Sequence, residues 1–320
     1  MAVYTKLAEH DVKTLLSHYQ IGVLDQFEEI SAGIENTNYF VDTQCSESGQ
    51  VRRWVLTIFE NVSAQELPYF SDLTNYLARE GFKVPAPLKT KKGEYNFSFQ
   101  NKTGLIVPRL KGRSLTQPDQ HACAEVGRYL ADMHLSLRDF TQNRRLVRDI
   151  NWMQTQTSLL EGQMGEAEFS TLSFYLARYL DYSSDLQKCP QGTVHGDLFR
   201  DNVLFEKGKI SGVFDFYHAC NATLLFDLAV IANDWTVEEG VHDSDKLFSL
   251  VSAYQSQRPW TEMEHLMWPK CLELAALRFW LSRLVSLHLP SYQQESLRGE
   301  TLKNPDEMKA ILVGLSHLSA

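Results

Sequence analysis

Cysteine is scarce in this chain, which has five among 320 residues and no Cys-x-x-Cys pair. Their number is odd and they lie far apart in the sequence, at Cys45, Cys123, Cys189, Cys220 and Cys271. These features argue against a disulfide scaffold or a cysteine-based zinc site as the organising element of the fold. Unpaired thiols are typical of a reducing compartment, so the sequence predicts a cytoplasmic protein.

Basic residues are outnumbered by acidic ones, with 31 Lys and Arg against 40 Asp and Glu, and the formal net charge is -9. Proteins that bind nucleic acid or an anionic membrane surface present a basic footprint to these partners. The charge balance therefore argues against both as the main partner.

Long apolar runs are also missing. The most apolar stretch, residues 272–289, is interrupted by Glu273, Arg278 and Arg283, so it is not expected to span a bilayer. Residues 1–11 lack the apolar core of a signal peptide. With 43% hydrophobic residues, no internal repeat and no low-complexity segment, the 320-residue chain predicts a folded protein of two lobes.

What the sequence does contain is a polar loop inside an apolar stretch at residues 193–205. Asp197 is followed five positions later by Asn202, and the residues after Asn202 have the pattern of a short β-hairpin. This hairpin ends at Asp215, so it is expected to carry a second carboxylate back over the loop.

This ordered set suits phosphoryl transfer. The reaction needs a carboxylate beside the acceptor hydroxyl, which is the role predicted for Asp197. It also needs oxygen ligands for the Mg²⁺ ion that neutralises the phosphates, a role that fits Asn202 and Asp215. Two nearby residues have other expected roles: His195 either orients the loop backbone or contacts substrate, and Asp201 is a loop or cap residue.

The same residues resemble a known superfamily. His-Gly-Asp-x-x-x-x-Asn at residues 195–202, followed by Val-Phe-Asp-Phe at 213–216, is similar to the motifs of the aminoglycoside phosphotransferase and choline kinase superfamily. Residues 33–41, 55–60 and 277–284 more closely resemble the kinase-like bacterial homoserine kinases. The matching segments extend over nearly the whole chain.

The resemblance implies an α+β, bilobal, protein-kinase-like fold. Residues 1–107 are expected to form a nucleotide-binding lobe with a five-stranded antiparallel sheet and a helix, in which residues 51–59 are the third strand. Residues 108–320 are expected to form a larger, mostly helical lobe for catalysis and acceptor binding. Asp227 is a charge inside an apolar helical segment of this lobe, and we expect it to support the catalytic loop.

The connection before the second strand lies where kinases place a glycine-rich loop over the ATP phosphates. Gly33 supplies backbone freedom there, and Asn36 and Asn38 supply amide donors. The residues alone also allow an ordinary hairpin turn. By analogy, Val107 and Arg109 lie at the hinge where adenine would meet backbone groups.

Thr57 stands where related kinases carry a lysine that reaches the phosphates. The homoserine kinases resemble this chain in having that threonine, so its presence does not imply inactivity. A hydroxyl cannot supply the missing positive charge. We expect Arg200, together with Mg²⁺, to supply it, with Arg53 on the third strand as the alternative.

Residues expected to shape the acceptor site follow Asp215 and lie near the C-terminus. Tyr217 and His218 are close in sequence to the metal-binding carboxylate. Arg278, or Arg283 if the helix is rotated, can present a planar fork to a carboxylate, although either can equally form a structural salt bridge. Pro269 predicts a break before this helix.

The resemblance therefore implies an ATP- and Mg²⁺-dependent kinase that phosphorylates the side-chain hydroxyl of L-homoserine in threonine biosynthesis, by direct in-line transfer. The partner would be a small amino acid, and the sequence carries no signal of an oligomeric state. Two alternatives stay open. The acceptor could be choline, methylthioribose or an aminoglycoside, or the chain could be a nucleotide-binding pseudokinase, which Thr57 favours and the Asp197, Asn202 and Asp215 set opposes.

Overall fold

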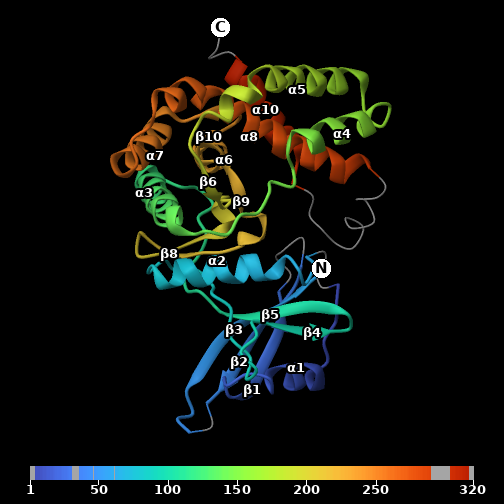
Figure 1. Cartoon of the computed structure of the whole chain (residues 1–320), viewed down its shortest axis with the longest axis vertical. Helices are drawn as coiled ribbons and strands as arrows, with labels where there is room; N and C mark the ends of the chain where they lie inside the picture. The colour runs from blue at the N-terminus through green and yellow to red at the C-terminus, as the bar shows by residue number, and fades with distance from the viewer. Residues whose placement is uncertain (1–3, 31–35, 46, 61, 290–302, 317–320) are drawn as a thin grey trace. The chain divides into compact units, whose positions relative to one another are not determined.

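The structure is a computed structural model that describes residues 4–30, 36–45, 47–60, 62–289 and 303–316. Its contacts divide these residues into two compact units (Figure 1). Among the described residues, those up to Lys111 form the first unit and those from Gly112 form the second.

The first unit contains the predicted five-stranded antiparallel sheet, with strand order β1-β2-β3-β5-β4. Its strands are β1 (Val23–Glu29), β2 (Asn36–Gln44), β3 (Val51–Phe59), β4 (Asn96–Phe99) and β5 (Lys102–Pro108). The prediction of the third strand at residues 51–59 is confirmed. Its Val, Trp, Thr, Ile and Phe residues are good strand formers, which is why the sequence identifies this strand well.

Side chains alternate between the two faces of this sheet. Trp54, Leu56 and Ile58 of β3 belong to the apolar core that also contains the buried side of α1 (Glu9–Leu16). The residues between them, including Thr57, face the opposite side. Helix α2 (Leu67–Arg79) lies across the sheet from α1 (Figure 1), so the two faces have different surroundings.

Close packing at the centre of the sheet requires Gly104 on β5. A Cβ atom there would lie 2.4 Å from the ring of Phe97 and 2.6 Å from the carbonyl oxygen of Thr57. Both distances are far below van der Waals contact, so any side chain at position 104 would force β3, β4 and β5 apart.

The second unit is mostly helical, as predicted. Its helices are α3 (Gln120–Ser136), α4 (Ile150–Leu160), α5 (Glu166–Leu186), α6 (Leu224–Trp235), α7 (Ser244–Gln257), α8 (Glu262–His288) and α10 (Pro305–Ser316). Short pairs of strands lie among them, β6 (Gln191–Val194) with β9 (Cys220–Thr223), β7 (Val203–Glu206) with β8 (Lys209–Val213), and β10 (Val237–Glu238) with β11 (Val241–His242). Single 3₁₀ turns are η1 (Leu137–Asp139), η2 (Arg200–Asn202) and η3 (Phe216–His218).

Helix α8 runs through Pro269 without interruption, so the predicted break there is wrong. Proline in a helix interior costs about 3 kcal/mol because it removes a hydrogen bond and crowds the preceding turn. The residues from Cys271 to Leu281 are all buried, so burial around the whole circumference outweighs this local cost.

Helix α4 was also not predicted as a separate helix. Asp149 caps it by accepting a hydrogen bond from the backbone N–H of Trp152 at 3.0 Å.

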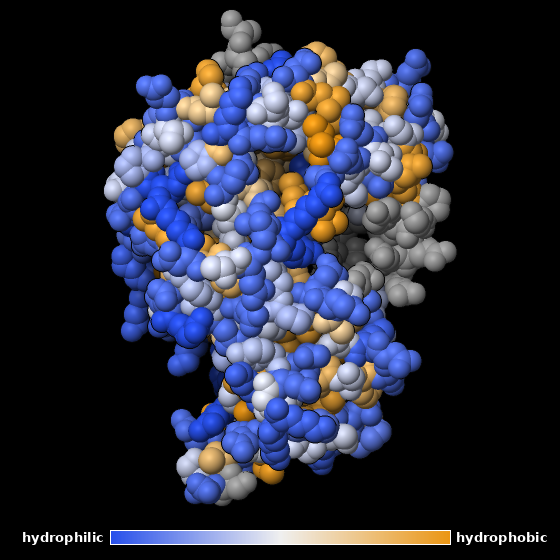
Figure 2. Space-filling view, viewed as in Figure 1, coloured by the Kyte–Doolittle hydropathy of each residue, from blue (hydrophilic) through white to orange (hydrophobic). Residues whose placement is uncertain are grey.

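All five cysteines are free. Within the described residues no helix is both long and apolar enough to cross a membrane. The face shown in Figure 2 is mainly hydrophilic, with hydrophobic side chains scattered over it.

Candidate active site

The catalytic loop starts where β6 ends, and a buried carboxylate fixes its backbone. Asp227 of α6 accepts hydrogen bonds from the backbone N–H groups of His195 at 2.6 Å and Gly196 at 2.7 Å. A third bond, at 3.1 Å, links Asp227 to Nε2 of His134 on α3. Burial by itself raises the pKa of Asp227. The hydrogen bonds and the two neighbouring histidines lower this pKa by a larger amount, so the net shift is downward. The prediction that Asp227 supports this loop is confirmed.

His195 is held inside the loop and points at no open surface. Its side chain is buried, its Nδ1 accepts from the Asp197 N–H at 3.3 Å, and its Nε2 lies 3.0 Å from the carbonyl oxygen of Phe214. Burial lowers the pKa of His195. Because Nδ1 accepts a hydrogen bond and Nε2 faces a carbonyl oxygen, the geometry suits a proton on Nε2. Of the two roles considered for this residue, the geometry favours orienting the loop backbone.

Gly196 adopts a conformation that favours glycine, with φ of +79°. A Cβ atom at this position would lie 2.8 Å from the carbonyl oxygen of His218. The close approach places η3, which contains Tyr217 and His218, against the catalytic loop. On another side, Arg278 of α8 donates from Nη2 to the Gly196 carbonyl at 2.8 Å.

The three residues predicted for catalysis and metal binding come together at this loop. Asn202 donates from Nδ2 to the Asp197 carbonyl at 2.9 Å and to Oδ2 of the Asp197 carboxylate at 3.3 Å. The β7–β8 hairpin pairs Val203 with Val213, and the Phe214 N–H donates to the Asn202 carbonyl at 3.1 Å. Asp215 therefore comes next to Asn202, as the sequence predicted.

The orientation of Asn202 suits a cation ligand. Its amide nitrogen is directed at Asp197, so Oδ1 faces the other way, and within the described residues Oδ1 accepts no hydrogen bond. Asp215 follows with φ of 67°, a left-handed conformation that turns the chain sharply at this position. An amide oxygen and carboxylate oxygens are the donors that Mg²⁺ prefers. The residues present therefore fit such an ion.

Arg200, predicted to replace the strand lysine, is bound within the second unit. Its backbone N–H donates to Oδ2 of Asp234 at 2.7 Å, its Nε lies 3.6 Å from Oδ1 of Asp234, and its Nη1 donates to the Thr116 carbonyl at 3.0 Å. Burial raises the pKa of Asp234 to about 6 despite this arginine. Arg200 therefore anchors the turn that carries Asn202.

In the first unit, the predicted nucleotide-binding residues share one sheet face. Asn38 lies directly opposite Thr57 in the β2–β3 register, and Asn36 lies opposite Phe59. Thr57 Oγ1 donates to Asn38 Oδ1 at 2.7 Å, and Asn38 Nδ2 donates to the Asn36 carbonyl at 3.2 Å. A hydroxyl–amide pair thus occupies the place of the lysine. Gly33 lies outside the described residues.

The predicted hinge residues lie along β5 and just after it. Val107 pairs with Val55 across the β3–β5 register. The Arg109 N–H donates to the Arg53 carbonyl at 3.0 Å, so it is already used within the sheet. The Arg109 guanidinium lies 3.7 Å from the ring centroid of Phe40. Arg53, the alternative cation, has its Nε 3.6 Å from a carboxylate oxygen of Asp42.

The two arginines considered for the acceptor have different surroundings. Arg283 donates from Nη1 to the Asn304 carbonyl at 2.6 Å and to a carboxylate oxygen of Glu307 at 2.9 Å. It therefore tethers α10 to α8. Arg278 is buried and reaches the catalytic loop, as described above. Of the two, only Arg278 is seen to touch that loop.

Arg278 also lines a cavity of about 380 Å³ in the second unit. Its polar lining comes from α4, α5, β9 and the segment before α4, and includes Arg145, Arg148, Asp149, Asn151, Ser183 and Asn221. Arg148 donates from Nη1 to Ser282 Oγ at 3.0 Å. Sequence reasoning missed this group, although residues 144–149 hold three arginines and an aspartate within six positions.

Comparison with known proteins explains the arrangement. Residues 26–260 match the phosphotransferase enzyme family. The chain belongs to this family.

Two relatives of this phosphotransferase are homoserine kinases. That of Cupriavidus pinatubonensis (strain JMP 134 / LMG 1197) is 37% identical over 298 residues, which cover 91% of this chain and 90% of the relative. That of Methylobacillus flagellatus is 38% identical over 291 residues, covering 91% and 89%. A similar solved structure is amicoumacin kinase hAmiN in complex with AMP-PNP, Ca2+ and Ami, with a TM-score of 0.73, 16% identity and coverage of 96% of this chain and 94% of that one. The predicted protein-kinase-like fold and kinase family are confirmed.

Proposed function

We propose that this phosphotransferase moves the γ-phosphoryl group of ATP to the side-chain hydroxyl of L-homoserine. The observation that carries the choice of acceptor is the 37% identity, over about nine tenths of both chains, to a homoserine kinase. A cytoplasmic role in threonine biosynthesis is part of this proposal, and the similarity to homoserine kinases supports it.

Asp197 is the residue that takes the proton of the acceptor hydroxyl. Its backbone N–H is held by His195, and its carboxylate by Asn202, so its position is fixed before substrate binds. Asn202 and Asp215 would hold Mg²⁺ through Oδ1 and a carboxylate oxygen. When bound, the ion neutralises charge on the β- and γ-phosphates.

Residues 1–107 are proposed to bind the nucleotide on the sheet face that carries Asn36, Asn38 and Thr57. Amide and hydroxyl donors there can meet phosphate oxygens without a lysine. Gly33 belongs to the same proposal by its place in the sequence. Val107 and the Arg109–Phe40 stack lie further along the same strands, where a flat adenine ring can pack.

Residues 108–320 are proposed to bind the acceptor in the cavity of about 380 Å³. Its arginines suit a carboxylate, and Asp149 suits an ammonium group. Arg278 lines this cavity and donates to the Gly196 carbonyl, which supports an acceptor site next to the catalytic loop. Tyr217 and His218 pack on the same loop and are proposed to border the acceptor hydroxyl.

A coupled assay of ADP release tests the reaction and its acceptor together. Homoserine, choline, methylthioribose and an aminoglycoside are compared at equal concentration with ATP and Mg²⁺. We expect homoserine to have the highest kcat/KM. A higher kcat/KM with another compound would identify that compound as the acceptor in place of homoserine. No ADP release with any of the compounds would favour the pseudokinase alternative.

Asp197→Asn tests the mechanism. Loss of the general base is expected to reduce kcat by about 10²- to 10⁴-fold, while the affinity for ATP, measured by titration calorimetry, stays near that of the wild type. A kcat within a few-fold of wild type would remove Asp197 from this role.

A further inference from the structure

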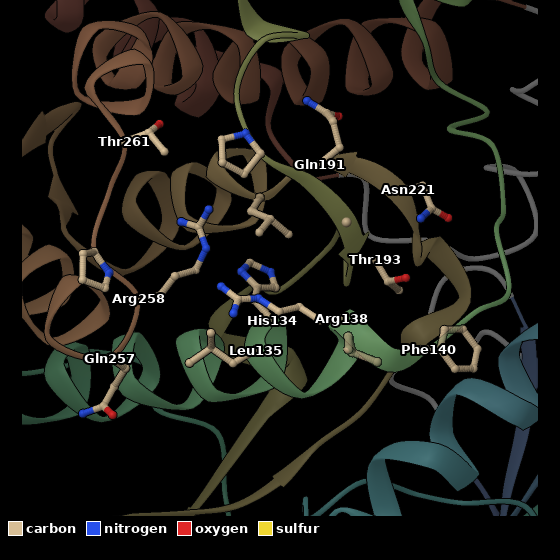
Figure 3. Close-up of a pocket in the computed structure, with 15 residues that line it drawn as sticks. His134, Leu135, Arg138, Phe140, Gln191, Thr193, Asn221, Gln257, Arg258 and Thr261 are labelled. Carbon is tan, nitrogen blue, oxygen red and sulfur yellow. The ribbon is translucent and has the colours of Figure 1, made fainter.

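A second cavity in the helical unit lies apart from the proposed acceptor cavity. Its volume is about 580 Å³, which is in the range of small-molecule sites. It is lined by the end of α3, the segment after it, β6, β9 and the α7–α8 connection (Figure 3). The two cavities share Gln191 and Asn221, which lie on the β6–β9 ribbon between them.

The lining of this cavity is basic and rich in hydrogen-bonding groups. Its polar members are His134, Arg138, Gln191, Thr193, Asn221, Gln257, Arg258 and Thr261. No aspartate or glutamate is among the residues that line it. The chain has a formal net charge of -9, so most of its surface repels anions. A cavity with no carboxylate among its lining residues is more favourable for an anion.

The two arginines differ in how far their charge is already compensated. Arg258 is buried and its Nη1 lies 2.7 Å from Oε1 of Glu264, whose side chain is fully buried. Arg138 is exposed and makes no hydrogen bond or ion pair within the described part of the chain. Both guanidinium groups are directed toward the centre of the cavity in Figure 3. Arg138 therefore leaves a net positive charge at the site.

The wall of the cavity is continuous with the support of the catalytic loop. His134 lines the cavity and is hydrogen bonded on both ring nitrogens, through Nδ1 to Tyr254 Oη at 2.9 Å and through Nε2 to Asp227 at 3.1 Å. Asp227 in turn holds the backbone N–H groups at positions 195 and 196. Thr193 on β6 also lines the cavity, and it lies two residues before His195 in the sequence. A ligand in the cavity would thus contact two elements that set the position of the loop.

We propose that this cavity is a binding site for a small organic anion, a carboxylate or a phosphate monoester, and that its occupancy changes the rate of the kinase reaction. Arg138 provides the charge that selects the anion, because a guanidinium binds carboxylate and phosphate oxygens with paired N–H donors. Gln257, Asn221 and Thr261 provide further polar contacts. The binding part of the proposal is independent of the proposed function, whereas the effect on rate rests on it.

Titration calorimetry on the full chain tests binding, with the active site filled by homoserine, Mg²⁺ and a non-hydrolysable ATP analogue. The probes are inorganic phosphate and succinate, which separate the two classes of anion. We expect saturable binding of at least one probe, weakened about tenfold or more in Arg138→Gln, since this variant removes the charge-assisted hydrogen bonds to the anion. Arg128→Gln is the control, because it removes an arginine charge from the preceding helix α3, where Arg128 pairs with Glu125 at 2.6 Å and does not line the cavity.

A second variant guards against a folding defect. Gln257 is exposed, so Gln257→Glu should fold and should weaken binding by adding a like charge. Saturable binding that is weakened by both cavity variants and retained in Arg128→Gln supports the site. No saturable binding in the millimolar range, or equal affinity in Arg138→Gln and Arg128→Gln, overturns it.

The effect on rate is measured as the ratio of kcat/KM with and without the bound probe, within each variant. We expect a ratio different from one in wild type and in Arg128→Gln, and a ratio near one in Arg138→Gln. Binding with an unchanged ratio in wild type would overturn the coupling to catalysis. An enzyme that lacks homoserine kinase activity but still binds the anion would instead overturn only the proposed function.

Discussion

Replacing Asp227 by asparagine exchanges one carboxylate oxygen for an amide nitrogen at the support of the catalytic loop. Three N–H donors meet at this carboxylate, two from the backbone at 2.6 and 2.7 Å and one from His134 at 3.1 Å. Asparagine offers one acceptor oxygen and one NH₂ group. At least one of the three donors must then face another donor inside the core.

The size of the expected stability loss follows from the burial of the Asp227 side chain, which has no exposed surface. A hydrogen bond to a charged group contributes about 1.5–3 kcal/mol, and an unpaired buried donor adds about 1–3 kcal/mol of desolvation cost. We expect the free energy of unfolding to fall by about 3–5 kcal/mol, the range for breaking a buried charged pair. Because the loop carries Asp197, a shift of about 1 Å is expected to lower kcat about a hundredfold.

Urea denaturation at pH 7 measures the stability change, and the ADP-release assay measures kcat. Asp185→Asn is a suitable control, because Asp185 forms an exposed pair with Lys188 at 2.7 Å and such pairs contribute little. A loss of stability below about 1 kcal/mol with kcat unchanged would refute the reasoning. The folded-state pKa of Asp227 is lowered, so its contribution is present at neutral pH and is lost as the pH falls through that value. The difference between wild type and Asp227→Asn should therefore shrink in acid.

Three further predictions concern other positions. Gly196→Ala should lower both stability and kcat, because alanine at φ of +79° costs about 1–2 kcal/mol and its Cβ would lie 2.8 Å from a carbonyl oxygen; wild-type kcat and melting temperature would contradict this. Thr57→Val removes the donor to Asn38 and should raise the KM for ATP with a stability loss of about 1 kcal/mol, whereas Thr57→Ser should retain most of the affinity. Burial raises the pKa of Asp234 to about 6, so the unfolded chain loses this proton first and the free energy of unfolding should fall as the pH rises from about 4 to about 6. Asp234→Asn should remove this slope, and an identical slope in the variant would show that another group causes it.

The sequence by itself determined the local elements and the order of the site. Residues 51–59 form a strand because β-branched and aromatic residues dominate them. The close approach of Asp197, Asn202 and Asp215 was predictable from their spacing. The residues between Asn202 and Asp215 form a β-hairpin, and a hairpin brings its two ends together. The isolated charge of Asp227 within an apolar helix required a nearby polar partner.

Only the tertiary structure decided which partners the charged side chains choose. Arg200 binds Asp234, 34 positions away, and Arg283 binds α10, because a long flexible side chain pairs with whichever carboxylate or carbonyl the fold brings near. Pro269 stays helical since burial of α8 on all sides exceeds a local backbone cost. The two cavities assemble residues from several helices and strands, and no local pattern encodes such a set, because its members share a place in space and have no common sequence period.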